Sequence, residues 1–179
     1  MALHAGIEID GSDVSIAVVD STAKQTVIID YIEAKIIGES SEERLASLES
    51  ILHGALENHG SKTIEVVSSI PTRMSTLREI SVPFTNEDVI SKTIRYESEG
   101  HLPSASIDDL IIEFIKCSET EDSSRLLISA VQKKIVGAHL EMLREGGVDP
   151  VQVEVDATAL ATSLHVSRPD LRGGRTLLI

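Results

Sequence analysis

Residues 3–19 read LHAGIEIDGSDVSIAVV, which predicts two apolar strands joined by a tight acidic turn. Asp10-Gly11 is a hairpin signal, because glycine adopts positive φ without steric cost, and the β-branched residues on either side favour strands. This end of the hairpin gathers polar side chains that could serve one ligand site: Glu8, Asp10, Ser12 and Asp13.

Two interpretations of these residues stay open. Backbone amides and a hydroxyl can bind phosphate oxygens, and a carboxylate at the end of a first strand can hold the water shell of Mg²⁺. On this interpretation Asp10, Gly11, Ser12 and Asp13 form a phosphate-binding turn, and Glu8 contacts Mg²⁺ through water. The alternative is a surface hairpin with acidic turn residues, a common arrangement.

Composition and charge narrow the class of protein. The chain has 179 residues, enough for one ordinary domain or two small ones. Its formal net charge of −13 opposes binding to nucleic acid. Cys117 is the sole cysteine, which excludes an internal disulfide, and its apolar neighbours predict a buried thiol. We expect a cytosolic protein, since no apolar run reaches membrane-spanning length and residues 1–6 do not open a signal peptide.

Hydrophobic periodicity predicts three strands, a helix and a fourth strand in the first 71 residues. The third strand is expected over Thr26–Ile37. Ser40 and Glu43 then form a capping-box pattern, and the helix that follows is expected to end near Gly60. Thr63–Ile70 reads as the fourth strand. This β-β-β-α-β order is typical of ribonuclease-H-like layers.

The segment 74–146 predicts a second unit with the order β-α-β-β-α. Thr85 is predicted as the N-cap of its first helix, with Asp88 three residues later. The acidic residues 119–122 are expected at a solvated hairpin tip. The strands of this unit are expected at 74–83, 110–117 and 125–131, and its second helix near 135–146.

The last part of the chain returns to the first pattern. Residues 151–155 alternate as a strand, and Asp156 is expected to cap a short helix over 157–164. Residues 168–174 have the composition of a linker, and 176–179 look like the start of one more strand. We therefore expect that the chain continues into a larger protein.

Three stretches resemble one family. GIEIDGSDVSIAVVD, residues 6–20, is similar to the first phosphate motif of actin-like ATPases. The inserted unit narrows the resemblance to the bacterial branch that contains FtsA and PilM. IPTRMSTLREISVPFTNEDVISKTIRYESEGHLP (70–103) and ISAVQKKIVGAHLEMLREGGVDPVQVEVDATALA (128–161) resemble PilM-type type IV pilus assembly proteins. The resemblance extends from Gly6 to Ile179.

The resemblance implies an α/β fold made of two subdomains. A ribonuclease-H-like (actin-like) subdomain would comprise residues 1–72 and 148–167, with an inserted β-α-β-β-α subdomain at 73–147. Residues 168–179 would be a linker and the start of a second lobe. That lobe would carry the second phosphate motif and the adenosine-binding residues, so ATP and Mg²⁺ would be possible ligands only of the full-length protein.

The family also implies a partner. PilM-type proteins are cytosolic members of an inner-membrane platform and bind the cytoplasmic tail of a single-span, PilN-type membrane protein in a groove between the two subdomains. Contacts with other pilus platform proteins would follow, without nucleic acid and without direct membrane insertion. Tyr96 could line that groove, although partial burial against the sheet is the alternative. A groove of this kind grips an extended peptide through main-chain hydrogen bonds and side-chain pockets.

Departures from the family pattern bear on nucleotide binding. The family reads Gly-Ile-Asp-Ile-Gly-Ser with a lysine soon after, whereas here Glu8 replaces the aspartate, Asp10 the glycine, and Ser15 the lysine. At an effective dielectric constant near 20, each close pair of like charges costs several kcal/mol. We therefore expect nucleotide binding to be weak or absent. No catalytic residue is assigned, and enzymatic activity stays open but is not favoured.

Other functions remain as alternatives. A GspL-like component of type II secretion shares the architecture, and an FtsA-like cell-division adaptor is a further possibility. An ATP-dependent enzyme of the sugar-kinase branch is less favoured, because the inserted unit, the acidic turn and the missing lysine all argue against it. The part of the protein after Ile179 would distinguish these alternatives.

Overall fold

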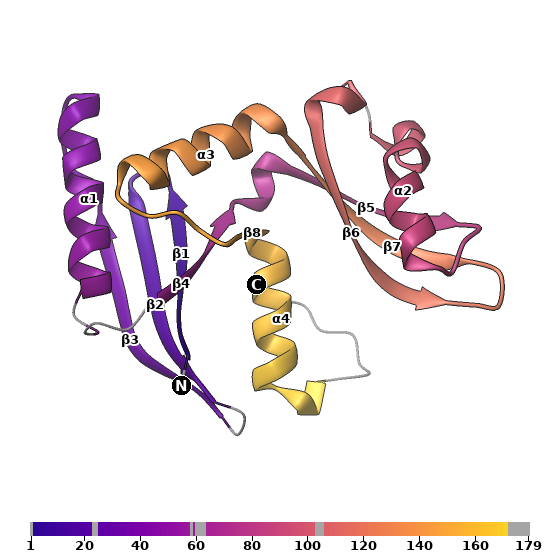
Figure 1. The fold of residues 1–179 in the computed structure, drawn as a ribbon, viewed down its shortest axis with the longest axis horizontal. Coiled ribbons are helices and arrows are strands. Elements are labelled where there is room, and N and C mark those ends of the chain that lie inside the picture. The colour runs from indigo at the N-terminus through magenta and orange to yellow at the C-terminus, as the bar shows by residue number, and fades with distance from the viewer. Residues whose placement is uncertain (1, 23–24, 58, 60–63, 103–105, 172–179) are drawn as a thin grey trace. The chain divides into compact units, whose positions relative to one another are not determined.

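The structure, a computed structural model, describes residues 2–22, 25–57, 59, 64–102 and 106–171. The chain divides into two compact units (Figure 1). Unit 1 comprises Met1–Pro71 and Met142–Ile179, and unit 2 comprises Thr72–Glu141. The strand predicted at 176–179 and the helix end predicted at Gly60 lie outside the described residues.

Unit 1 is built on a five-stranded mixed sheet with the order β3-β2-β1-β4-β8. β1 pairs antiparallel with β2 and parallel with β4, β2 pairs antiparallel with β3, and β4 pairs parallel with β8. This mixed sheet, together with the antiparallel sheet of unit 2, confirms the predicted α/β, actin-like fold class. The strands are β1 (Ala2–Asp10), β2 (Asp13–Ser21), β3 (Thr26–Lys35), β4 (Ile64–Ile70) and β8 (Gln152–Val155), and the helices are α1 (Ser41–Glu57) and α4 (Asp156–Ser167), followed by the 3-10 turn η4 (Pro169–Leu171).

The core of unit 1 lies between one face of this sheet and α1. Alternate residues of β1 and β2 are buried, because successive side chains of a strand point to opposite faces. Leu48, Leu52 and Ala55 of α1 pack against them. The buried strand residues of this cluster are Ala5, Ile7, Ile9, Val14, Ile16, Val18 and Val66. Figure 1 shows α1 on this side of the sheet and α4 on the other.

The capping box predicted at the start of α1 is confirmed. The Glu43 N–H donates to Ser40 Oγ at 3.2 Å, and Glu43 Oε2 accepts from the Ser40 N–H at 3.2 Å. The same oxygen accepts from the Glu39 N–H at 2.7 Å. These backbone donors, Glu39 first, lower the pKa of Glu43. Local sequence therefore determines where α1 begins.

Replacing Ser40 with alanine is expected to lower the free energy of unfolding by about 1 kcal/mol, because the N–H of Glu43 loses its acceptor.

Glu43→Gln tests whether the negative charge of the Glu43 carboxylate stabilises the folded protein. Since folding lowers the pKa of Glu43, its stabilising effect is present above the pKa of the unfolded chain and is lost as the pH falls through the folded value. Urea unfolding at pH 7 and pH 3 measures both effects. A wild-type advantage over Glu43→Gln that is equal at both pH values would contradict the capping role.

Unit 2 is a three-stranded antiparallel sheet with the order β5-β7-β6. Its core packs α2 against one face of that sheet. The helix α3 (Lys133–Glu145) begins in unit 2 and ends in unit 1. The remaining elements are η1 (Thr72–Met74), β5 (Ser75–Val82), α2 (Glu87–Glu97), η2 (Glu99–His101), η3 (Ile107–Asp109), β6 (Leu110–Glu119) and β7 (Ser124–Gln132).

Two predicted helix caps are wrong by one residue. Asn86, and not Thr85, caps α2, because its Oδ1 accepts from the N–H groups of Asp88 at 2.9 Å and Val89 at 3.2 Å. Asp156 is the first residue of α4 and does not cap it. β8 ends at Val155, which takes the cap position without a side-chain bond, because the strand runs directly into the helix.

Cys117 is exposed, so the predicted buried thiol is wrong. The residue lies on β6, where Ile112 and Phe114 are partly buried against the core of unit 2 and the alternate residues Glu113 and Ile115 are exposed. Cys117 follows the alternation of the exposed set, and its apolar neighbours in sequence therefore do not indicate its burial. The acidic residues 119–122 are exposed, as predicted.

Candidate functional site

The turn between β1 and β2 holds four of the predicted site residues. β1 ends at Asp10 and β2 begins at Asp13, and these two residues are directly paired across the hairpin. Gly11 has φ +66°, a conformation that glycine adopts without strain. The Ser12 carbonyl accepts from the Ile36 N–H at 2.7 Å, which ties the turn to the end of β3. The structure thus brings Asp10, Gly11, Ser12 and Asp13 together in one tight turn.

Two basic residues contact this turn, and sequence reasoning missed both. Lys35 Nζ lies 2.6 Å from Asp13 Oδ1. Arg44, in the first turn of α1, donates from Nη2 to Ser12 Oγ at 3.4 Å. They partly offset the negative charge of the turn, although an exposed ion pair such as Lys35–Asp13 contributes little to stability. Both come from elements more than 20 residues further along the chain, so only the fold reveals them.

Glu8 lies beside the turn, on the face of the sheet that α1 does not cover. Buried residues of β1 have odd numbers and point to α1, so Glu8 and Asp10 point to the opposite face. Their Cα atoms are about 7 Å apart, two residues along one strand. Within the described residues, no three His, Cys, Asp or Glu side chains are grouped as a metal site requires. The role of Glu8 toward Mg²⁺ stays a prediction.

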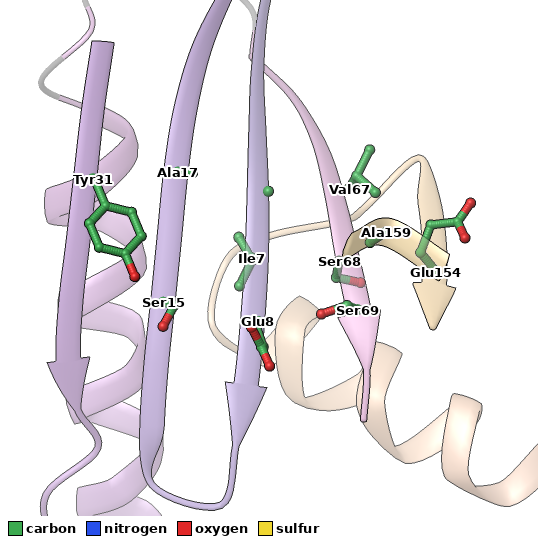
Figure 2. Close-up of a pocket in the computed structure, with 11 residues that line it drawn as sticks. Ile7, Glu8, Ser15, Ala17, Tyr31, Val67, Ser68, Ser69, Glu154 and Ala159 are labelled. Atoms are coloured by element: carbon green, nitrogen blue, oxygen red, sulfur yellow. The ribbon is translucent and has the colours of Figure 1, made fainter. Parts of the chain in front are cut away.

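A pocket of about 260 Å³ opens on the same face of unit 1 (Figure 2). Its floor is formed by small and apolar residues of the central strands, among them Gly6, Ala17 and Val67. Tyr31 of β3 and Ala159 of α4 line opposite sides. A Cβ built on Gly6 meets no atom within 4 Å, which shows that the space above the floor is open. We call this pocket the trough.

Strand register places a row of polar residues along one side of the trough. Glu8 is paired with Ser15 on β2 and with Ser69 on β4. The row continues outward, since Ser15 is paired with Glu33 on β3 and Ser69 with Glu154 on β8. Directly paired residues point to the same face, so a carboxylate stands on every second strand of the row. We call these residues the carboxylate row: Glu33, Ser15, Glu8, Ser69 and Glu154.

Neutral side chains donate hydrogen bonds to two of the three carboxylates in this row. The Tyr31 hydroxyl donates to Glu33 Oε1 at 2.8 Å. This bond raises the pKa of Tyr31, and the negative charges of Glu33 and Glu8 raise it further, because they oppose a phenolate. At the other end, Glu154 accepts hydrogen bonds from Gln152 Nε2 and Thr158 Oγ1. Ion pairs among the described residues include none of the three carboxylates of the row.

Tyr96 lies in unit 2, on α2, with 74% of its surface exposed. Partial burial, the alternative considered from sequence, is therefore wrong. An exposed aromatic ring is available to a partner, but no observation assigns one to it. The contact of Tyr96 with a partner stays a prediction.

Comparison with known proteins identifies the fold. No family model matches the sequence, and no curated protein is significantly similar to it. A chain of the PilM-PilN type IV pilus biogenesis complex superposes on 95% of this chain with a TM-score of 0.72 and 21% sequence identity. The chain has a PilM-like, actin-like fold.

A second solved structure shares this fold. The cytoplasmic domain of EpsL, an inner-membrane component of the type II secretion system of Vibrio cholerae, superposes on 88% of the chain with a TM-score of 0.60 and 16% identity. The chain covers 51% of the PilM-like structure and 59% of the EpsL domain, so it spans about half the length of its structural relatives. None of the described helices is long and apolar enough to cross a membrane.

The residues predicted for the nucleotide site lie close together in unit 1, whereas Tyr96 lies in unit 2. The hairpin turn and the trough both belong to unit 1, and both lie on or next to the face that α1 leaves free. Sequence reasoning found the turn, because its signals are local. It missed Arg44, Lys35, Glu33 and Glu154, whose positions follow from strand order and register.

Proposed function

We propose that the protein is a component of a type IV pilus or secretion platform at the inner membrane, where it acts as a cytoplasmic adaptor. On this proposal it binds the cytoplasmic tail of a single-span, PilN-type membrane protein and reaches the membrane only through its partners. The observation that carries the proposal is the superposition on a chain of the PilM-PilN complex, which extends over 95% of this chain and so includes unit 2. A sheet of the ribonuclease-H type alone would not support an adaptor over an enzyme.

The features of the turn support docking over nucleotide chemistry. Lys35, one of the two basic residues that contact the turn, is already paired with Asp13 at 2.6 Å. Asp10 and Glu8 add negative charge next to the position that a phosphate would take. We therefore propose that the protein binds Mg-ATP weakly or not at all and that its adaptor role does not depend on hydrolysis.

Isothermal titration with Mg-ATP tests the nucleotide part of the proposal. We expect no saturable heat at micromolar ligand, because the carboxylates of Asp10, Asp13 and Glu8 repel phosphate oxygens. The double variant Asp10→Gly/Ser15→Lys restores the family pattern at two positions and is expected to bind more tightly than the natural sequence. Micromolar affinity of the unaltered protein would contradict the proposal.

A separate observation supports a type II secretion platform as the alternative. The similarity to the EpsL cytoplasmic domain favours type II secretion as the alternative system. A pull-down with the cytoplasmic tails of single-span proteins distinguishes a pilus platform from a type II secretion platform. The system to which the captured tail belongs identifies the platform. We expect capture by the native tail and none by a scrambled tail. Failure of the protein to bind the tail would contradict the adaptor role.

A further inference from the structure

Negative charge is spread over the whole chain and is not confined to one patch. The sequence holds 29 acidic and 16 basic residues and has a formal net charge of −13. Acidic residues outnumber basic ones in unit 1 and in unit 2 taken separately. Such a charge acts on a charged partner before contact, over a Debye length of about 10 Å at 0.1 M salt. The chain therefore attracts cationic segments from solution, wherever their final contact lies.

Ion pairs within the structure neutralise much of the positive charge. Several lysine and arginine side chains lie within 4.0 Å of a carboxylate: Lys35, Arg95, Lys116, Arg125, Arg144 and Arg168. By contrast, four exposed carboxylates on different elements form no ion pair with another described residue. We call them the free carboxylates: Glu49, Glu121, Asp122 and Glu141. The charge that remains to act on a partner is therefore mainly that of carboxylates.

The partner in the proposed function is expected to carry the opposite charge. It is the cytoplasmic tail of a single-span membrane protein, and residues on the cytoplasmic side of a membrane span are enriched in lysine and arginine, because these charges set the orientation of the span. The cytoplasmic leaflet itself is anionic and repels a chain of net charge −13. Electrostatics therefore favour the tail over the lipid surface from which it emerges.

We propose that the chain captures a lysine- or arginine-rich segment of the tail by long-range electrostatic attraction, so that charge sets the rate of association and short-range contacts set the rate of dissociation. Complementary charge acts mainly on the association rate, because it steers the encounter of the two molecules. The inference rests on the proposed function and adds to it the chemistry of the partner segment and the way in which the segment is captured.

Stopped-flow fluorescence measures both rates. The probe is a fluorescein-labelled synthetic peptide with the sequence of the tail that the pull-down identifies, and a second peptide has glutamine in place of every lysine and arginine. Between about 0.01 M and 0.3 M NaCl, the association rate constant of the natural peptide is expected to fall at least about tenfold, while its dissociation rate constant changes less than about twofold. The glutamine peptide is expected to associate slowly at every salt concentration.

Variants of the free carboxylates test the contribution of this chain. Glu49→Gln/Glu121→Gln/Asp122→Asn/Glu141→Gln removes four negative charges and is expected to slow association at low salt about two- to fivefold. The matched control Glu49→Asp/Glu121→Asp/Asp122→Glu/Glu141→Asp keeps every charge and is expected to associate at the rate of the natural protein. Circular dichroism verifies the fold of both variants, and the two peptides keep the test valid if either variant does not fold.

The outcomes separate this inference from the proposed function. Three results overturn the inference alone: tight binding of the tail at a rate that does not depend on salt, equally fast association of the glutamine peptide, or equal slowing in both four-site variants. A natural tail peptide that binds at no salt concentration overturns the proposed function, and the inference with it.

Discussion

Leu52→Ala is expected to lower the free energy of unfolding by about 2–5 kcal/mol. Leu52 is fully buried between α1 and the sheet of unit 1. A Cβ built on Gly146 would lie only 2.9 Å from Leu52 Cδ1, which shows how tightly this side chain is enclosed. Truncation removes apolar contacts and leaves a cavity that close neighbours cannot easily fill. Urea denaturation followed by circular dichroism measures the loss.

Leu160→Ala is the matched control, because Leu160 in α4 is 54% exposed. The same chemical change there is expected to alter the free energy of unfolding by less than about 0.5 kcal/mol. Similar small losses in both variants would contradict the core described for unit 1, since they would mean that Leu52 is also accessible to water.

Gly38→Ala is expected to cost about 2–5 kcal/mol, from backbone strain and overpacking together. Gly38 has φ +139°, a region that other residues rarely adopt. An added Cβ would lie 2.6 Å from Glu43 Cβ and 2.8 Å from the Arg44 nitrogen, in the first turn of α1. Because backbone atoms are involved, a side-chain rotation cannot relieve the clash. The change also disturbs the helix that carries Arg44 to the turn.

Gly54→Ala, within α1 itself, provides the contrast. A Cβ at Gly54 meets no atom within 4 Å, and alanine favours helix over glycine by about 1 kcal/mol. Thermal unfolding is expected to show a higher midpoint for Gly54→Ala and a much lower one for Gly38→Ala. A Gly38→Ala variant as stable as the natural protein would show that this connection does not have the tight geometry described.

The fold class could be predicted because its signals are local. Alternation in β1 and β2 fixes which residues face α1, and the Ser40–Glu43 capping box fixes where α1 begins. Signals one residue apart are harder to separate. Thr85 and Asn86 can both cap a helix, and the choice depends on where the chain leaves β5. Cys117 shows a further limit, since burial depends on which face of β6 is covered.

The candidate site likewise contains residues that local sequence predicts and residues that only the strand order brings together. Asp10, Gly11, Ser12 and Asp13 are consecutive, so their proximity follows from one turn. Glu33 and Glu154 join Glu8 only because β3 and β8 lie at opposite edges of a sheet whose centre is β1. That strand order is a property of the whole unit. No spacing in the sequence predicts it, although the resemblance to actin-like proteins implies the general arrangement.

On the proposed function, the protein binds the cytoplasmic tail of a membrane protein and binds Mg-ATP weakly or not at all. Isothermal titration of the protein with the cytoplasmic tail of the proposed single-span partner, followed by Mg-ATP, tests this most directly. We predict saturable heat corresponding to one tail per protein and no saturable heat from the nucleotide. Tight binding of Mg-ATP together with no heat from the tail would contradict the account.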